Sequence, residues 1–263
     1  MGTFFRAVFE KAGCEVWVSG RETPCRAEDI AQNCTVVMVS VPIRETVAVI
    51  ERITPLLSED QLVCDITSLK VAPVSAMLAS RAKVIGLHPM FGPTVKDLAG
   101  QTIIATPARC DRETQEEILG VFRSQGARIT ITTPEDHDRV MAVVQGLTHY
   151  VTLGVAETMR RLGLTPRETL DFMSPIYQIE MCLVGRLLSQ DPSLYADILQ
   201  LNPHVPPVLA ACEDSFATLR QAIEGGDPGS FVEIFRDNTR NFGDYCERAA
   251  TESDMLIAAM VGK

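Results

Sequence analysis

The order of the expected secondary structure constrains this chain more than any other feature. Short apolar segments alternate with helical ones over residues 1–133, and from Pro134 onward apolar residues recur at three- and four-residue spacing. Alternating strands and helices are typical of an open parallel sheet, whereas continuous helical spacing is typical of an all-helical domain. We therefore predict an α/β fold, with a doubly wound sheet in residues 1–133 and a helical domain in residues 134–263.

The individual elements follow from the same patterns. The predicted strands are residues 15–19, 35–41, 61–66, 83–87, 102–105 and 128–132. The predicted helices of the first domain are residues 3–12, 26–32, 44–57, 71–80 and 111–125. Those of the second domain are residues 135–162, 166–171, 175–190, 193–201, 206–224, 228–248 and 249–261. The first domain is expected to consist of βαβ units throughout, and the second to keep its own core.

Composition narrows the class of function. The 24 basic and 34 acidic residues give a net charge of −10, which disfavours a nucleic-acid partner. No apolar run approaches the ~18 residues of a membrane span. The eight cysteines form no Cys-x-x-Cys pair and no regular framework, so they predict neither a metal site nor a disulfide scaffold. We expect a cytoplasmic protein that acts on a small molecule and buries most of its cysteines in its core.

A histidine stands at the end of one predicted strand. The segment 84–93 reads Val-Ile-Gly-Leu-His-Pro-Met-Phe-Gly-Pro, so that strand 83–87 leads directly into His88 and a rigid turn. In open α/β sheets, ligands bind beyond the carboxyl ends of the strands. His88 is therefore placed where a proton-transfer group is expected. The alternative is a histidine that closes a buried strand and bonds a carbonyl oxygen.

The neighbouring predicted strand ends in a turn that carries a hydroxyl group. Residues 65–70 read Asp-Ile-Thr-Ser-Leu-Lys, which brings Ser68 to the same edge of the sheet as His88. Ser68 has two interpretations: it caps the following helix, or it hydrogen-bonds near the histidine. The two roles are compatible.

Three further positions in the helical half are candidates. Gln145 and His149 lie one helical turn apart, and Arg186 falls in line with Ile179, Cys182 and Leu183. A guanidinium on an apolar stripe must reach solvent, pair with an acid, or meet an anionic ligand. For His137 and His149 the ordinary interpretation is a core histidine, and His204 has no assigned role.

Two motifs carry a resemblance to a known family. The string His-Pro-Met-Phe-Gly-Pro at 88–93 and the run from Ser174-Pro-Ile-Tyr to Gly-Arg-Leu187 resemble the prephenate/arogenate dehydrogenase family. The resemblance implies a Rossmann-type domain, a helical domain that forms a homodimer, and oxidative decarboxylation of prephenate to 4-hydroxyphenylpyruvate with hydride transfer to NAD(P)⁺ in tyrosine biosynthesis. It also implies roles for individual residues. His88 and Ser68 would be catalytic, Arg186 would pair with a substrate carboxylate, and His149, Gln145 and Tyr177 would bind substrate.

The expected cofactor end departs from the family pattern. The chain enters its first helix at Gly2, so only the last glycine of a Gly-x-Gly-x-x-Gly fingerprint is present. We expect the natural protein to begin upstream with the first Rossmann strand, and cofactor binding to weaken without it. The other expected cofactor residues are Ser19, Arg21, Ser40, Val41 and Pro42. Arg21 favours NADP over NAD because an arginine accommodates a 2′-phosphate, although Glu22 follows it.

Alternatives from other classes remain open at this point. Gln178 replaces a basic residue of some relatives, which leaves prephenate and arogenate both possible. A β-hydroxyacid dehydrogenase or imine reductase would resemble this architecture, but its catalytic lysine is missing from residues 135–162. A catalytically silent dimeric ligand-binding protein that lost its cofactor strand is the other alternative, and nucleotide binding distinguishes it from an enzyme.

Overall fold

The computed structural model describes residues 1–262, apart from the side chain of Leu170. The chain divides into two compact units. The first, here called the sheet unit, comprises residues 1–142 together with 196–202. The second, the helical unit, comprises residues 143–195 and the chain from Pro203 onward.

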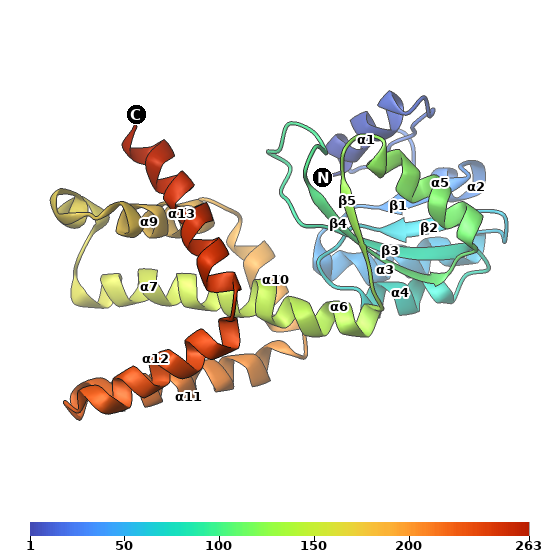
Figure 1. Ribbon diagram of the computed structural model, residues 1–263. Coiled ribbons are helices and arrows are strands. Elements are labelled where there is room, and N and C mark those ends of the chain that lie inside the picture. The colour runs from blue at the N-terminus through green and yellow to red at the C-terminus, as the bar shows by residue number, and fades with distance from the viewer. Residues whose placement is uncertain (263) are drawn as a thin grey trace. The chain divides into compact units, whose positions relative to one another are not determined.

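The sheet unit is built on five strands (Figure 1). They are β1 (Val36–Val39), β2 (Leu62–Asp65), β3 (Lys83–Pro89), β4 (Thr102–Arg109) and β5 (Arg128–Ile131), and they are hydrogen-bonded in that order. The first three strands run parallel, as do β4 and β5. The α/β class and five of the six predicted strands are thereby confirmed.

The pairing of β3 with β4 corrects the expectation of βαβ units throughout. These two strands are antiparallel, and His88 lies opposite Ile104. The intervening residues 90–101 form turns and bends rather than a helix. Parallel strands are usually joined by a crossover helix, and residues 90–101 contain none, so the chain returns antiparallel. The pairing also extends β3 past the predicted end at residue 87 to include His88 and Pro89.

Helices cover both faces of this sheet (Figure 1). One face packs against α1 (Gly2–Lys11) and α5 (Arg112–Arg123), which contribute Phe5 and Phe122 to its core. The other face packs against α2 (Ala27–Asn33), α3 (Ile43–Ile53) and α4 (Val71–Leu78). Side chains of β3 alternate between the faces: Ile85 and Leu87 belong to the first core and Val84 to the second. By this alternation His88 lies on the α4 face.

The predicted strand at residues 15–19 is wrong. These residues have no regular secondary structure, and Trp17 and Val18 are 45% and 39% exposed. A strand forms only beside a hydrogen-bonding neighbour. Within residues 1–262, β1 pairs with β2 alone, and a cavity lined by both β1 and residues 14–21 lies beside β1.

The helical unit begins with an irregular turn. Residues 134–162 are helical throughout, as predicted for 135–162, with a π-helix (Ala142–Leu147) between α6 (Pro134–Met141) and α7 (Thr148–Leu162). The later elements are α8 (Pro166–Thr169), a 3₁₀ turn (Leu170–Phe172), α9 (Pro175–Leu188), α10 (Pro192–Leu201), α11 (Val205–Glu224), α12 (Pro228–Phe242) and α13 (Tyr245–Val261). The last break falls at Gly243, which has φ +57°, rather than at residue 248.

Buried apolar residues are distributed unevenly between the units. Among the described residues, the helical unit buries only Val184 and Val205 of its apolar side chains, whereas Phe172, Leu162 and Phe235 are 88%, 68% and 65% exposed. The expectation that the helical domain keeps its own core is therefore wrong for a single chain. The cysteines also differ from expectation, because Cys64 alone is buried and Cys14, Cys182 and Cys246 are exposed.

The packing at Gly86 gives a test of the sheet unit. A Cβ at Gly86 would lie 2.4 Å from Thr106 Oγ1 and 2.8 Å from Val74 Cγ2, both on stiff, branched side chains. Gly86→Ala is expected to destabilise the unit by about 1–3 kcal/mol through overpacking. A Cβ at Gly120 of α5 meets nothing within 4 Å, so Gly120→Ala should stabilise by about 0.5–1 kcal/mol. Urea unfolding followed by circular dichroism measures both; equal midpoints for Gly86→Ala and wild type would contradict the packing.

Candidate active site

His88 lies at the carboxyl end of β3 and is 3% exposed. Its Nδ1 atom lies 2.8 Å from Nε2 of His137, and the two rings meet edge to face with centroids 5.0 Å apart. This contact differs from the alternative interpretation, in which His88 ends a strand and hydrogen-bonds a carbonyl oxygen. The partner of His88 Nδ1 is instead a ring nitrogen of His137.

His137 comes from α6, which begins at Pro134 after a Thr133 side-chain cap. The histidine is fully buried, and its Nδ1 atom lies 2.7 Å from Oδ1 of Asp138. The three side chains therefore form a buried series that runs from Asp138 through His137 to His88. All three belong to the sheet unit.

Asp138 also organises the start of α4. Its Oδ1 accepts the backbone N–H of Lys70 at 2.8 Å, and its Oδ2 accepts that of Val71 at 3.0 Å. These are orphan donors of the first helical turn, which side chains commonly satisfy. The Asn202 side chain in turn donates to the Asp138 backbone carbonyl at 2.7 Å.

Ser68 does not cap α4. The helix begins at Val71, and its capping position, Lys70, makes no side-chain cap bond, since Asp138 takes that role. Ser68 is half-buried, three residues beyond Asp65 of β2. Asp65 is in register with Gly86, two residues before His88. Ser68, which follows β2, and His88, near the end of the neighbouring parallel strand β3, therefore lie at the same edge of the sheet, as predicted.

A buried ion pair supports this edge. Lys70 is fully buried, and its ammonium donates to Oδ2 of Asp65 and, at 2.7 Å, to the carbonyl oxygen of Leu87. Burial lowers the pKa of Lys70 and raises that of Asp65, while their mutual attraction opposes both shifts. Within the described residues, Asp65 Oδ1 and Thr67 Oγ1 have no hydrogen-bond partner.

The same surroundings keep His88 neutral. Burial lowers the pKa of His88 well below its usual 6.5, and the neighbouring His137 and Lys70 act in the same direction. A neutral imidazole at neutral pH has a lone pair with which to accept a proton. An imidazole in this state can act as a general base.

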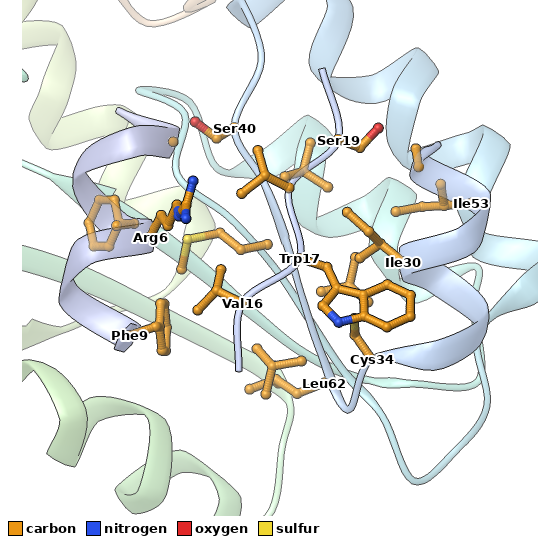
Figure 2. Close-up of a pocket in the computed structure, with 18 of the residues that line it drawn as sticks. Arg6, Phe9, Val16, Trp17, Ser19, Ile30, Cys34, Ser40, Ile53 and Leu62 are labelled. Carbon is orange, nitrogen blue, oxygen red and sulfur yellow. The ribbon is translucent and has the colours of Figure 1, made fainter. Parts of the chain in front are cut away.

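Five of the six predicted cofactor residues line one cavity (Figure 2). It has a volume of about 850 Å³, and Gly2, Ser19, Arg21, Ser40 and Val41 all line it. In Figure 2 the Ser19 and Ser40 hydroxyls lie at one end, while Val16 and Leu62 lie toward the other. Pro42 is not among the lining residues and instead occupies the capping position of α3.

The polar end of this cavity suits an anion. Gly2 opens α1, whose first turn has no side-chain cap and no acidic residue, so its backbone N–H groups are available to a phosphate. A Cβ on Gly2 would lie 3.5 Å from Ser40 Oγ, which places the serine beside that helix end. Arg21 is exposed and lies 3.4 Å from Glu45. These residues fit a dinucleotide phosphate.

The predicted substrate residues all lie in the helical unit. His149 packs edge to face on Tyr195 with ring centroids 4.8 Å apart, and burial lowers the pKa of His149. Gln145 lies in the π-helix, so it and His149 do not share a regular α-helical face. The Tyr177 hydroxyl is 3.0 Å from Thr169 Oγ1.

Arg186 lies on an exposed face of α9 rather than on the apolar stripe that the sequence predicts. It is exposed in the last turn of α9, and its expected neighbours Cys182 and Leu183 are exposed as well. The buried residue of α9 is Val184. The predicted apolar stripe is therefore not a buried face within this chain, and the guanidinium is open to solvent.

Sequence reasoning missed the residues that support His88. The sequence predicts no role for Asp138 or Lys70, and for His137 it favours a core histidine. A local signal existed, because His137-Asp138 is an imidazole next to a carboxylate. Their partners lie 49 and 68 residues away, which no local pattern reveals.

Two family models match this chain. The nucleotide-binding domain of prephenate dehydrogenase matches residues 20–131, and its dimerization domain matches residues 133–237. A probable arogenate/prephenate dehydrogenase of Methanocaldococcus jannaschii is 31% identical over 100% of this chain and 63% of its own length. The T-protein of Haemophilus influenzae is 33% identical over 98% of this chain and 68% of its own length. This chain belongs to the prephenate dehydrogenase family.

A solved structure shows the same fold. Prephenate dehydrogenase from A. aeolicus, in complex with hydroxyphenyl propionate and NAD⁺, superposes with a TM-score of 0.68 at 24% identity, over 91% of this chain and 84% of that one. The chain spans about two thirds of the length of the curated relatives above. None of the helices in residues 1–262 is long and apolar enough to cross a membrane.

Proposed function

We propose that this protein is an NAD(P)-dependent prephenate or arogenate dehydrogenase of tyrosine biosynthesis. With prephenate, the reaction is an oxidative decarboxylation to 4-hydroxyphenylpyruvate. The observation that carries the proposal is His88, a buried imidazole with a lowered pKa at the carboxyl end of β3, in a chain of this family. A cytoplasmic location is part of the proposal.

His88 has the principal chemical task. It accepts the proton of the ring hydroxyl as that carbon is oxidised, and Ser68 orients the hydroxyl. Bound NAD(P)⁺ supplies the hydride acceptor. The ring carboxylate leaves as CO₂, and formation of the aromatic ring drives the reaction.

The helical unit supplies the proposed substrate contacts. Arg186 presents a guanidinium that can bind a carboxylate through two hydrogen bonds. His149, Gln145 and Tyr177 are proposed to line the substrate site. Their exposed or half-buried side chains support this assignment. Prephenate and arogenate remain alternative substrates because they share the ring carboxylate and hydroxyl.

The cofactor is proposed to bind in the cavity between α1 and β1. The helix start at Gly2 would hold the pyrophosphate, with Ser19, Ser40 and Val41 beside it. We propose NADP in preference to NAD. The support is Arg21, an exposed guanidinium on the cavity wall whose contact with Glu45 is long, at 3.4 Å.

The role of His88 is tested by His88→Asn, which removes the base. We expect kcat to fall at least ~100-fold with KM little changed, since a general base contributes about 10²–10⁴ in rate. The assay follows nicotinamide absorbance with prephenate and arogenate, each with NAD⁺ and NADP⁺. His204→Asn is the matched control, because His204 is exposed and has no proposed role. Turnover in His88→Asn at the wild-type rate would remove His88 from the mechanism. Failure of the wild-type chain to bind either nucleotide would favour the ligand-binding alternative.

Arg186→Ala tests the carboxylate contact. We expect KM to rise by ~10-fold or more while kcat changes little, because a charge-assisted hydrogen bond contributes about 1.5–3 kcal/mol. Arg167→Ala, which changes an exposed arginine of the same unit, is the control. Unchanged KM for both substrates would show that Arg186 does not bind them.

The helical unit is proposed to form a homodimer. Among the described residues, Val184 and Val205 are the only buried apolar side chains of this unit. Its many exposed apolar side chains are expected to pack against a partner surface. The matching dimerization domain of the family supports the same assignment. Sedimentation equilibrium of the full chain is expected to give twice the 28.8 kDa chain mass at micromolar concentration. A monomer at tens of micromolar would contradict it.

A further inference from the structure

The hydrogen-bond series through His88 fixes where its protons lie. The Asp138 carboxylate can only accept, so His137 Nδ1 must donate to it across 2.7 Å. A neutral His137 then has its lone pair on Nε2, which lies 2.8 Å from His88 Nδ1. His88 Nδ1 must therefore carry the hydrogen and donate. The lone pair of His88 is consequently on Nε2, the form that a base requires.

We propose that His137 acts through His88 as a positioning residue that sets this tautomer and then receives the positive charge when His88 accepts a proton. The catalytic part of this inference rests on the proposed dehydrogenase function, whereas the tautomer does not. It assigns a role to a pair, His137 and Asp138, that lies behind the base.

The proton transfers balance without any further reactant. The hydroxyl proton of the substrate bonds to His88 Nε2 as its O–H bond breaks. The proton on His88 Nδ1 moves to His137 Nε2. His88 becomes neutral again, with its hydrogen on Nε2, and His137 becomes an imidazolium that still donates to Asp138. One net proton has moved from the substrate to the histidine pair.

The charges around the pair explain why the proton ends on His137. Lys70, which precedes α4, acts unfavourably on a charged His88. Asp138 on α6 directly contacts His137, and Asp65 at the end of β2 also interacts with it. The charged groups that act on His88 and His137 thus come from the end of β2 (Asp65), from the residue before α4 (Lys70) and from α6 (Asp138). Lys70 therefore disfavours a positive charge on His88, whereas the Asp138 carboxylate lies against the ring of His137.

His137→Gln separates orientation from charge acceptance. A glutamine oxygen can reach the position of His137 Nε2 and accept the hydrogen bond of His88, but it cannot take up a proton at neutral pH. We expect kcat to fall at least ~10-fold. The acidic limb of kcat/KM should also move to lower pH, because protonation must then rest on the buried His88 beside Lys70. Asp136→Asn, an exposed change on the same helix, should leave both unchanged.

The tautomer is measured without any assay of activity. Two-bond ¹H–¹⁵N correlation spectra of the full chain with labelled histidine resolve only four imidazoles, and single variants assign them. At neutral pH we expect hydrogen on Nδ1 and a lone pair on Nε2 of His88, and the same tautomer in His137→Gln. A hydrogen on His88 Nε2, or a His137 protonated on both nitrogens, would overturn the proposal. So would an acidic limb that does not move in an active His137→Gln.

An inactive wild-type chain with the expected tautomer would contradict the dehydrogenase function alone. An active chain with the opposite tautomer would contradict this inference alone.

Discussion

The Asp138 carboxylate is the interaction on which the candidate site depends. One oxygen binds both the Lys70 backbone N–H and His137, and the other binds the Val71 backbone N–H. A single side chain of α6 thus closes the first turn of α4 and fixes the imidazole behind His88. A buried carboxylate is stable only when its hydrogen-bonding capacity is used, and three donors satisfy it here. Loss of Asp138 would therefore disturb both the fold and the site.

The site also depends on the reversal of direction at β4. Because β4 runs antiparallel to β3, its pairing continues past the last parallel partner of β3 and places Ile104 opposite His88. The histidine is therefore held by a strand at the point where parallel strands would leave a loop. Gly86 allows Lys70 and Thr106 to approach on the same face, since a Cβ there would lie 3.1 Å from Lys70 Cδ. Lys70 can then reach the Leu87 carbonyl oxygen beneath the histidine.

Local patterns predicted much of the fold and part of the site. Apolar runs bounded by turns located β1, β2, β3 and β5, because each is short, contains apolar residues and is followed by a clear stop. They failed at residues 15–19, where a strand-like composition has no neighbour to pair with, and at the direction of β4, which depends on the connection rather than on the strand. His88 and Ser68 were found because a strand end is a local feature. His137, Asp138 and Lys70 act through contacts distant in sequence, which only the folded chain brings together.

The side chains of the two units are held in place by different kinds of packing. The sheet unit buries both faces of its sheet within one chain, so His88, His137 and Asp138 are held by intramolecular packing. The helical unit carries Gln145, His149, Tyr177 and Arg186 on helices with few buried side chains. In the proposed dimer, association of two chains holds these side chains in place. The stability of the helical unit would then fall when the protein is diluted. Substrate affinity would then depend on protein concentration, whereas the tautomer and protonation of the histidine pair would not.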